Sequence, residues 1–182
     1  MNRTDDRDLI RQCRNGDRQA FEGLLVKYEK PVFNVAYRML SNTEDARDVT
    51  QTVFLKAFEH LDSFDERYRF FSWIYRIALN ESINCLNKQS RFDPLDQEPQ
   101  SDADGPAEET GSAEMSNTMQ AALMTITPEY RTVIILKHFV ECSYQEISRI
   151  LDIPEKTVKS RLYSGRQSLK EVLVREGVYS CQ

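Results

Sequence analysis

Apolar side chains recur along most of the chain at intervals of three and four residues, the spacing that places them on one face of an α-helix. No stretch alternates apolar and polar residues for long enough to predict a strand. Helix starts are marked by Asp17, by Asn42 or Thr43, and by Thr127 before Pro128. The pattern predicts an all-α protein. The apolar sets of the first half are Phe21, Leu24, Leu25 and Tyr28; Val32, Val35, Ala36 and Met39; Val49, Val53, Phe54, Ala57 and Leu61; and Ile74, Ile77, Ala78 and Cys85.

The helical pattern is interrupted between residues 91 and 115. This stretch, RFDPLDQEPQSDADGPAEETGSAEM, contains three of the six prolines and eight acidic residues against one basic residue. Its few large apolar side chains cannot offset the entropy that is lost when a chain becomes ordered. We therefore expect a flexible acidic linker over residues 91–115, between a helical domain over residues 8–90 and a second one over residues 116–177.

The second domain carries the sharpest local pattern. Residues 143–146 have the S-x-x-E form of a capping box, and residues 152–154, Asp-Ile-Pro, end the short helix that follows. A second helix is expected from about Glu155. Together they predict a helix-turn-helix over Tyr144 to Tyr163, whose second helix suits a DNA major groove. The alternative is a helical hairpin with a solvated basic face. The polar residues that share one side of the second helix are Lys156, Lys159, Tyr163, Arg166 and Lys170.

The first domain has an unusual helix face at about residues 46–61. A carboxylate, an amide, a hydroxyl and an apolar side chain lie together there, opposite the apolar face of the same helix. Such a mixture is typical of a surface that docks another protein. The alternative is a solvated face with one stray leucine. The residues on this face are Asp48, Gln51, Thr52, Leu55 and Glu59.

The segment from Asp62 to Trp73 is dense in aromatic residues and arginine. Aromatic side chains interleaved with arginine can stack on unpaired bases and bind phosphates. On the helix that follows, amide side chains, which can read base edges, share one side with Trp73 and Arg76. The alternative is that Phe70, Phe71 and Trp73 belong to the core. The amides are Asn80, Asn84 and Asn87.

The formal net charge is −5, from 24 basic and 29 acidic residues, which by itself argues against binding to nucleic acid. Residues 91–115, however, carry a net charge of −7, so the rest of the chain carries +2. Positive charge is concentrated on the second helix of the helix-turn-helix. The total charge therefore does not exclude a DNA-binding protein.

Several classes of protein are disfavoured. No apolar run approaches the roughly 20 residues that span a bilayer, and residues 1–8 lack the apolar core of a signal peptide, so we expect a cytoplasmic protein without membrane insertion. The four cysteines have no CxxC spacing, and no disulfide framework is expected. His138 and Cys142 are four residues apart, but zinc needs three or four ligands, so we expect no metal and no cofactor.

Taken together, these features resemble a bacterial sigma factor of the extracytoplasmic-function group of the sigma-70 family, which retains only the domains called regions 2 and 4. The resemblance runs from about Asp8 to Glu176. Its motifs are DVTQTVFLKAF at Asp48–Phe58, DSF at Asp62–Phe64, SWIYRIALN at Ser72–Asn80 and SYQEISRILDIPEKTVKSRLYSGRQSL at Ser143–Leu169.

This resemblance implies that region 2 docks on the clamp helices of the largest subunit of core RNA polymerase through the segment Asp48 to Leu61. Asp48 and Gln51 would be polar anchors beside Leu55, whereas Thr52 stands where the family often has Glu, so one charge contact would be missing. The polymerase flap would be a second contact.

The resemblance also implies that region 2 captures an unstacked base of the single-stranded −10 promoter element, at the cost of extruding it from the duplex. Ile74 stands where larger relatives commonly have a second aromatic residue, which predicts a weaker melting wedge. The residues expected at the −10 element are Phe64, Arg67, Trp73, Arg76 and Asn80.

Region 4 would read the −35 element as duplex DNA. Lys159 lacks the bidentate fork of arginine for guanine, so its role would be mainly electrostatic. Ser164 stands where relatives carry a further basic residue. The family also implies an anti-sigma factor as a partner. The residues expected at the −35 element are Lys156, Lys159, Ser160, Arg161, Tyr163 and Arg166.

The leading hypothesis is therefore an alternative sigma factor that directs core polymerase to promoters, opens the DNA and then leaves, with no catalytic site. A stand-alone helix-turn-helix regulator is the alternative, although the aromatic and arginine-rich loop is not needed for binding duplex DNA. An enzyme is disfavoured, because the sequence has no glycine-rich phosphate loop and its only histidines are His60 and His138.

Overall fold

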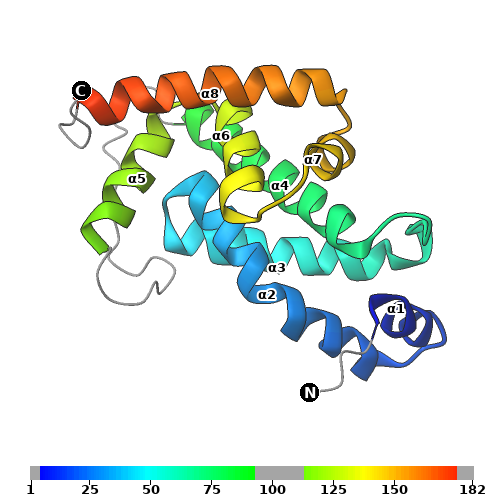
Figure 1. The fold of residues 1–182 in the computed structure, drawn as a ribbon. Helices are drawn as coiled ribbons and strands as arrows, with labels where there is room; N and C mark the ends of the chain where they lie inside the picture. Colours follow the sequence, from blue (N-terminus) through cyan, green and yellow to red (C-terminus); the bar gives the residue numbers. More distant parts are fainter. Residues whose placement is uncertain (1–4, 93–112, 176–182) are drawn as a thin grey trace.

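The computed structural model describes residues 5–92 and 113–175, and these residues form helices without any strand, which confirms the all-α prediction (Figure 1). Most of the predicted linker, residues 93–112, lies outside the described residues, and its two ends are helical. The elements are α1 (Asp6–Arg14), α2 (Arg18–Leu40), α3 (Thr43–Glu59), the 3-10 helix η1 (Leu61–Ser63), α4 (Phe70–Phe92), α5 (Ala113–Thr125), α6 (Pro128–Ile134), the π-helical turn η2 (Ile135–Phe139), α7 (Tyr144–Leu151) and α8 (Glu155–Arg175).

Most helix starts are fixed by the side chains that the sequence marked. Asp17 accepts a hydrogen bond from the backbone N–H of Gln19 at 2.9 Å, and Asn42 accepts one from Asp45 at 3.0 Å, so Asn42 rather than Thr43 caps α3. Thr127 occupies the cap position of α6 but makes no capping bond with its side chain. The start of that helix rests on Pro128, whose fixed backbone torsion suits a first helical residue.

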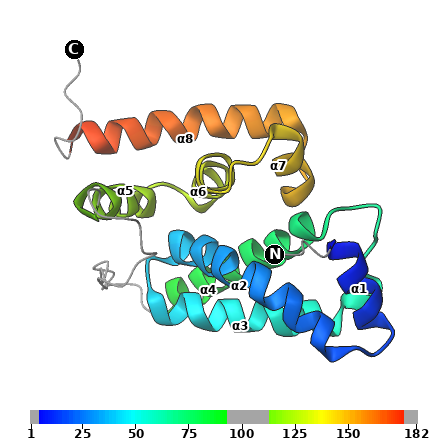
Figure 2. The ribbon, with the colours of Figure 1, turned by 60° about the horizontal axis from the view of Figure 1, so that its bottom comes forward.

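The first domain is a bundle of α2, α3 and α4, with α1 packed across one end (Figures 1 and 2). Tyr28 and Phe70 pack edge to face in this core, with ring centroids 5.3 Å apart. Most residues of the apolar faces predicted for the first half of the chain turn inward. Fully buried members of this core include Leu24, Val32, Val53, Ile74 and Ala78.

The second domain packs α6 and α7 against the long helix α8. Gly165 of α8 allows a close approach, because a Cβ atom there would lie 3.1 Å from side-chain atoms of Ile134 and Tyr130 of α6. The Asp152 backbone, with φ of 55°, ends α7 in a left-handed turn, and α8 begins three residues later. The buried residues of this core include Leu123, Ile135, Ile147, Val158 and Leu162.

The two domains lie directly on one another, with α5, α6 and α7 between α8 and the first bundle (Figure 2). The Arg131 side chain of α6 is buried and donates hydrogen bonds to the carbonyl oxygens of Met39, Met124 and Ile126. Gln120 of α5 donates to Tyr37 and Arg38 at 3.4 and 3.3 Å. The last carbonyls of a helix have no partner within it, so donors of the second domain complete the C-terminus of α2.

Within the part of the chain that the structure describes, no helix is both long enough and apolar enough to cross a membrane.

Candidate polymerase and nucleic-acid interfaces

The predicted helix-turn-helix is formed by α7, a three-residue turn and α8. Both halves of the capping box are present, since the N–H of Glu146 donates to Ser143 Oγ at 3.2 Å and the N–H of Ser143 donates to Glu146 Oε2 at 2.9 Å. The bond donated by the backbone N–H of Ser143 holds the pKa of Glu146 below its usual range. Ser148 Oγ then donates to the carbonyl of Ile153 at 2.6 Å and ties α7 to the turn.

The outer face of α8 is open to solvent (Figure 1). Tyr163 is 69% exposed. Among the other residues predicted to read the −35 element, Arg161 is half-buried, and the exposed ones are Lys156, Lys159, Ser160 and Arg166. Five of the six residues predicted at the −35 element are therefore exposed.

Two contacts from neighbouring elements shape this face. Lys159 Nζ lies 5.6 Å from the centroid of the Tyr144 ring. Arg166 Nε and Nη2 lie 3.3 and 3.2 Å from His138 Nε2. Burial, followed by the positive charges of Arg166 and Lys137, lowers the pKa of His138, so the imidazole is neutral and accepts from Arg166. His138 was not predicted to shape the reading surface, because nothing in the sequence places it beside a residue 28 positions away.

The predicted docking face on α3 is also exposed. Asp48 and Gln51 face solvent, and Leu55 is 64% exposed. Thr52 is half-buried and donates its hydroxyl hydrogen to the carbonyl of Asp48 at 2.9 Å.

An apolar groove of about 660 Å³ runs beside this face, between α2 and α3. Its lining includes Phe58, which is 51% exposed and packs on Phe21 with ring centroids 5.1 Å apart. The helical spacing placed Phe21 and Leu25 on an apolar face, and Phe58 was not singled out, although its spacing of three residues from Leu55 was an available signal. The apolar lining residues are Phe21, Leu25, Phe54, Leu55 and Phe58.

The aromatic loop before α4 is partly core and partly surface. Phe64 is only 5% exposed, and its ring lies 5.8 Å from Phe70 and 5.2 Å from Trp73. Trp73 is half-buried, and Arg67 is exposed and paired with Asp65 at 2.6 Å. The alternative that Phe70, Phe71 and Trp73 belong to the core therefore holds for Phe70, and Phe64, which was expected at the −10 element, is buried as well.

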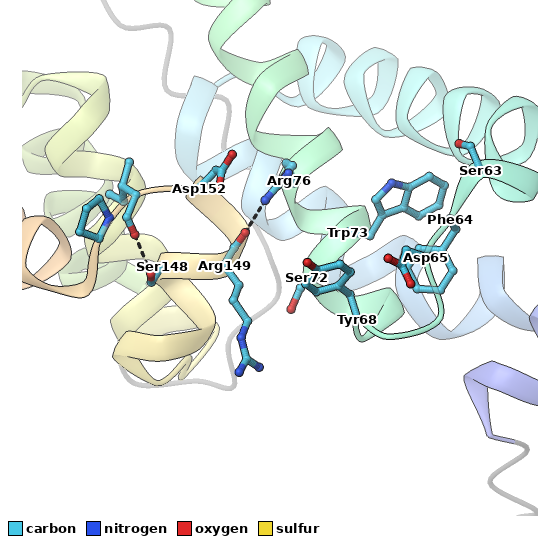
Figure 3. Close-up of a pocket in the computed structure, with 12 residues that line it drawn as sticks. Ser63, Phe64, Asp65, Tyr68, Ser72, Trp73, Arg76, Ser148, Arg149 and Asp152 are labelled. Carbon is cyan, nitrogen blue, oxygen red and sulfur yellow. Dashed lines mark hydrogen bonds between the residues drawn. The ribbon is translucent and has the colours of Figure 1, made fainter.

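Arg76 and Asn80 are exposed one turn apart on α4, followed along the same helix by Asn84 and Asn87. A cavity of about 640 Å³ opens beside Arg76 (Figure 3). The loop and α4 form one wall of it, with Phe64, Tyr68 and Trp73, and α7 with its following turn forms the other.

Comparisons with known proteins agree in both halves of the chain. The model of sigma-70 region 2 matches residues 24–92, and that of sigma-70 region 4 matches residues 116–169. The chain is 38% identical to the ECF RNA polymerase sigma factor SigW of Bacillus subtilis, over 90% of this chain and 94% of SigW. It is 34% identical to the ECF RNA polymerase sigma-E factor of Escherichia coli, over 90% and 92% of the two chains. This chain belongs to the extracytoplasmic-function group of sigma-70 factors.

Solved structures agree with this assignment. CnrH, in its complex with the cytosolic domain of CnrY, superposes with a TM-score of 0.72 at 25% identity, over 93% of this chain and 97% of CnrH. The sigma factor RpoE of Bartonella quintana, in its complex with the anti-sigma factor NepR, also has a TM-score of 0.72, over 84% and 96% of the two chains at 25% identity. The first domain of this ECF sigma factor is region 2 and the second is region 4. The predicted function in transcription initiation, with core RNA polymerase and promoter DNA as partners, is confirmed.

In this ECF sigma factor, region 4 covers part of the surface predicted for the −10 element. Arg76 Nε donates to the carbonyl of Ile150 at 3.0 Å, and Arg76 Nη2 donates to that of Arg149 at 2.5 Å (Figure 3). Arg69 Nη1 lies 2.9 Å from Glu146 Oε1. The guanidinium of Arg76 is therefore occupied by the C-terminal carbonyls of α7.

The described residues of this ECF sigma factor contain no group of three or more His, Cys, Asp or Glu side chains arranged to hold a metal ion.

Proposed function

We propose that this ECF sigma factor uses three separate surfaces in transcription initiation. The α3 face docks core polymerase, the loop before α4 together with α4 binds the single-stranded −10 element, and α8 reads the −35 duplex. The observation that supports the proposal most directly is the exposure of the polar residues of α8 and α3 on two well-packed domains. The functional units would cover residues 8–90 and 116–177, joined by the linker over residues 91–115.

The polymerase site would combine a polar edge with an apolar groove. Asp48 and Gln51 supply a charge and an amide, Thr52 contributes little because its hydroxyl is bound to its own helix, and Leu55 and Phe58 supply exposed apolar surface. An apolar groove flanked by polar groups suits a partner helix with an amphipathic face. We infer that this partner is the pair of clamp helices, and that region 4 contacts the flap.

At the −10 element, Trp73, Arg76 and Asn80 would contact the extruded base and its backbone, with Arg67 close to phosphate. Phe64 would act indirectly, because its ring is buried between Phe70 and Trp73 and supports the loop. The use of Arg76 requires α7 to move away, since the same donors cannot bind α7 and DNA together. Region 4 would therefore separate from region 2 during initiation.

At the −35 element, the exposed face of α8 would enter the major groove. Lys156 and Lys159 would neutralise phosphate, and Ser160, Arg161, Tyr163 and Arg166 would contact bases and phosphate. Ser164 leaves one phosphate contact unmade. These roles involve binding only, and the protein would have no active site and no cofactor.

An anti-sigma factor is proposed as a further partner, because the similar structure of RpoE is of its complex with the anti-sigma factor NepR. The similar structure of CnrH is likewise of a complex, with the cytosolic domain of CnrY. Since bacterial polymerase and the chromosome share the cytoplasm, the proposal implies that the protein acts there.

Run-off transcription with core polymerase on genomic fragments, followed by mapping of start sites, tests the whole proposal and yields both promoter elements.

For the docking face, the double variant Asp48→Ala and Gln51→Ala should bind core polymerase more weakly in a pull-down, whereas Arg11→Ala on the exposed side of α1 should not. Unchanged affinity of the double variant would remove the docking assignment.

A further inference from the structure

The loop that forms one wall of the cavity beside Arg76 has little regular structure of its own. After η1, residues 64–69 are held locally by a turn in which Asp65 Oδ1 accepts from the N–H of Arg67 at 3.0 Å and the N–H of Tyr68 donates to the carbonyl of Asp65 at 3.0 Å. Its residues Phe64, Asp65 and Tyr68 line the cavity. The buried Phe64 ring ties the start of the loop to the bundle, but these short-range bonds do not tie residues 65–69 to it.

Arg14 of α1 holds this loop from outside the cavity. Its Nη2 group donates to the carbonyl oxygens of Leu61, Asp62 and Phe64 at 3.0, 3.3 and 2.5 Å. Its Nη1 group pairs with Glu66 Oε1 at 2.6 Å. One guanidinium thus binds three backbone carbonyls and one carboxylate from a segment about 50 residues further along the chain. Only arginine presents several donors in a fixed plane that can do this.

Attachment of α1 to the bundle does not depend on these contacts. Ile10 is buried in the core, Tyr28 Oη donates to Asp6 Oδ2 at 2.6 Å, and Lys27 pairs with Asp6. Arg14 lies at the other end of the helix, and every partner that it has belongs to η1 or the loop. Its contacts therefore fix the loop to α1 rather than α1 to the bundle.

We propose that Arg14 is a positioning residue that sets the conformation of the loop over residues 64–69. Through this conformation it sets the preference of the loop for particular bases at the −10 element. This inference rests on the proposed function, in which the loop takes up an unstacked base. A loop that is held before binding loses less conformational entropy when DNA is bound, and the wall that this loop forms keeps one shape after α7 has moved away. Arg14 does not line the cavity and needs no contact with DNA.

The test uses holoenzyme assembled from core polymerase and the full chain. It is incubated with a library of fork-junction DNA whose single-stranded −10 positions are randomised, and the bound molecules are sequenced. With Arg14→Met, we expect the enrichment of the preferred base at the position read by the loop to fall about tenfold, equivalent to about 1.4 kcal/mol. Polymerase affinity should not change. Arg14→Lys keeps the charge beside Glu66 but lacks the fork, and should give an intermediate loss.

Two matched variants separate positioning from general damage. Arg11→Met removes an exposed arginine from the same helix, and Tyr28→Phe weakens the anchor of α1 without touching the loop; both should keep the base preference of the wild type. An unchanged profile for Arg14→Met would overturn the inference, as would an equal loss in Tyr28→Phe. If Arg14→Met does not fold, Arg14→Lys decides in the same way.

The variants Trp73→Ala and Asn80→Ala distinguish this inference from the proposed function. If they flatten the profile while Arg14→Met leaves it intact, the −10 assignment stands and the role of Arg14 is wrong. If none of the three changes the profile, the −10 assignment itself is wrong and the inference falls with it.

Discussion

Of the two surfaces proposed for promoter DNA, one is exposed and the other is partly covered by the second domain. On α8, Lys159, Tyr163 and Arg166 face solvent, and region 2 covers none of them. On α4, Arg76 is bound to two carbonyl oxygens at the end of α7. Reading of the −35 element therefore needs no rearrangement of the domains, whereas reading of the −10 element through Arg76 requires region 4 to leave.

The interface between the domains explains this difference, because each domain completes a helix C-terminus of the other. Arg131 of region 4 binds the carbonyl of Met39 in the last turn of α2, and Arg76 of region 2 binds the carbonyls of Ile150 and Arg149 at the end of α7. Arg131 is 4% exposed, and burial lowers its pKa to about 10, which still leaves it charged at neutral pH. Arg76 lies at the exposed edge. The contact at α7 is thus the easier one to open.

The largest effect is expected when the buried half of the interface is broken. Arg131→Met removes the donors for three carbonyls, two of which become buried without a partner, and we expect a loss of stability on the order of 2–4 kcal/mol. Urea denaturation measures the loss, and small-angle scattering measures separation of the domains. Arg149→Met, at an exposed side chain of α7, is the control. A loss below about 0.5 kcal/mol would contradict the buried role of Arg131.

A second comparison sets Arg76 against Arg166. Arg76→Ala should weaken binding of holoenzyme to −10 fork junctions by on the order of 1–3 kcal/mol and should also open the edge of the interface in the free chain. Arg166→Ala should cause a similar loss at the −35 duplex without any change between the domains. Hydrogen exchange of α7 reports the opening. Faster exchange in both variants would show that the two surfaces are not independent.

The exposed ion pair between Arg69 and Glu146 should contribute less. Arg69 has a side chain that is 73% exposed, and such pairs stabilise by about 0.2–1 kcal/mol. Arg69→Gln should therefore speed hydrogen exchange of α7 by at most about fivefold. Arg47→Gln, which breaks a surface pair within α3, is the matched control. Glu146 itself is unsuitable for substitution, because it also completes the capping box of α7. If the hydrogen exchange of α7 does not differ between the two variants, the contacts of Arg76 and Arg131 alone hold the domains together.

Much of the fold could be predicted from local sequence. The helical spacing, the caps at Asp17, Asn42 and Ser143, and the turn before Glu155 are all decided within a few residues, and the structure has each of them. The π-helical turn over Ile135–Phe139 was not predicted, because the continuous apolar run from Val133 to Leu136 is compatible with several helical forms.

The candidate site was only partly predictable, because its remaining features depend on tertiary contacts. Periodicity assigned Arg76 to a polar face, but its partners lie more than 70 residues away in α7. The family resemblance implied that Phe64 meets DNA, but its ring is buried. An aromatic residue in a loop gives no local sign of whether it faces the core or solvent. Arg14 showed no signal at all, because its role depends on the backbone of a distant loop.

The smallest effect is expected at the exposed face of α8, where the stability contributed by His138 depends on pH. The pKa of His138 is lowered by burial, then by Arg166 and Lys137, so the folded protein binds a proton there less readily than the unfolded chain. The stability that neutral His138 contributes is present above its ordinary value of 6.5 and is lost as the pH falls through the lowered folded pKa. Protonation also removes the acceptor for Arg166 and places two cations together. The unfolding free energy, measured by urea denaturation, should therefore decline less between pH 7 and pH 5 in His138→Gln than in the wild type. Equal declines in the two proteins would mean that His138 does not hold Arg166.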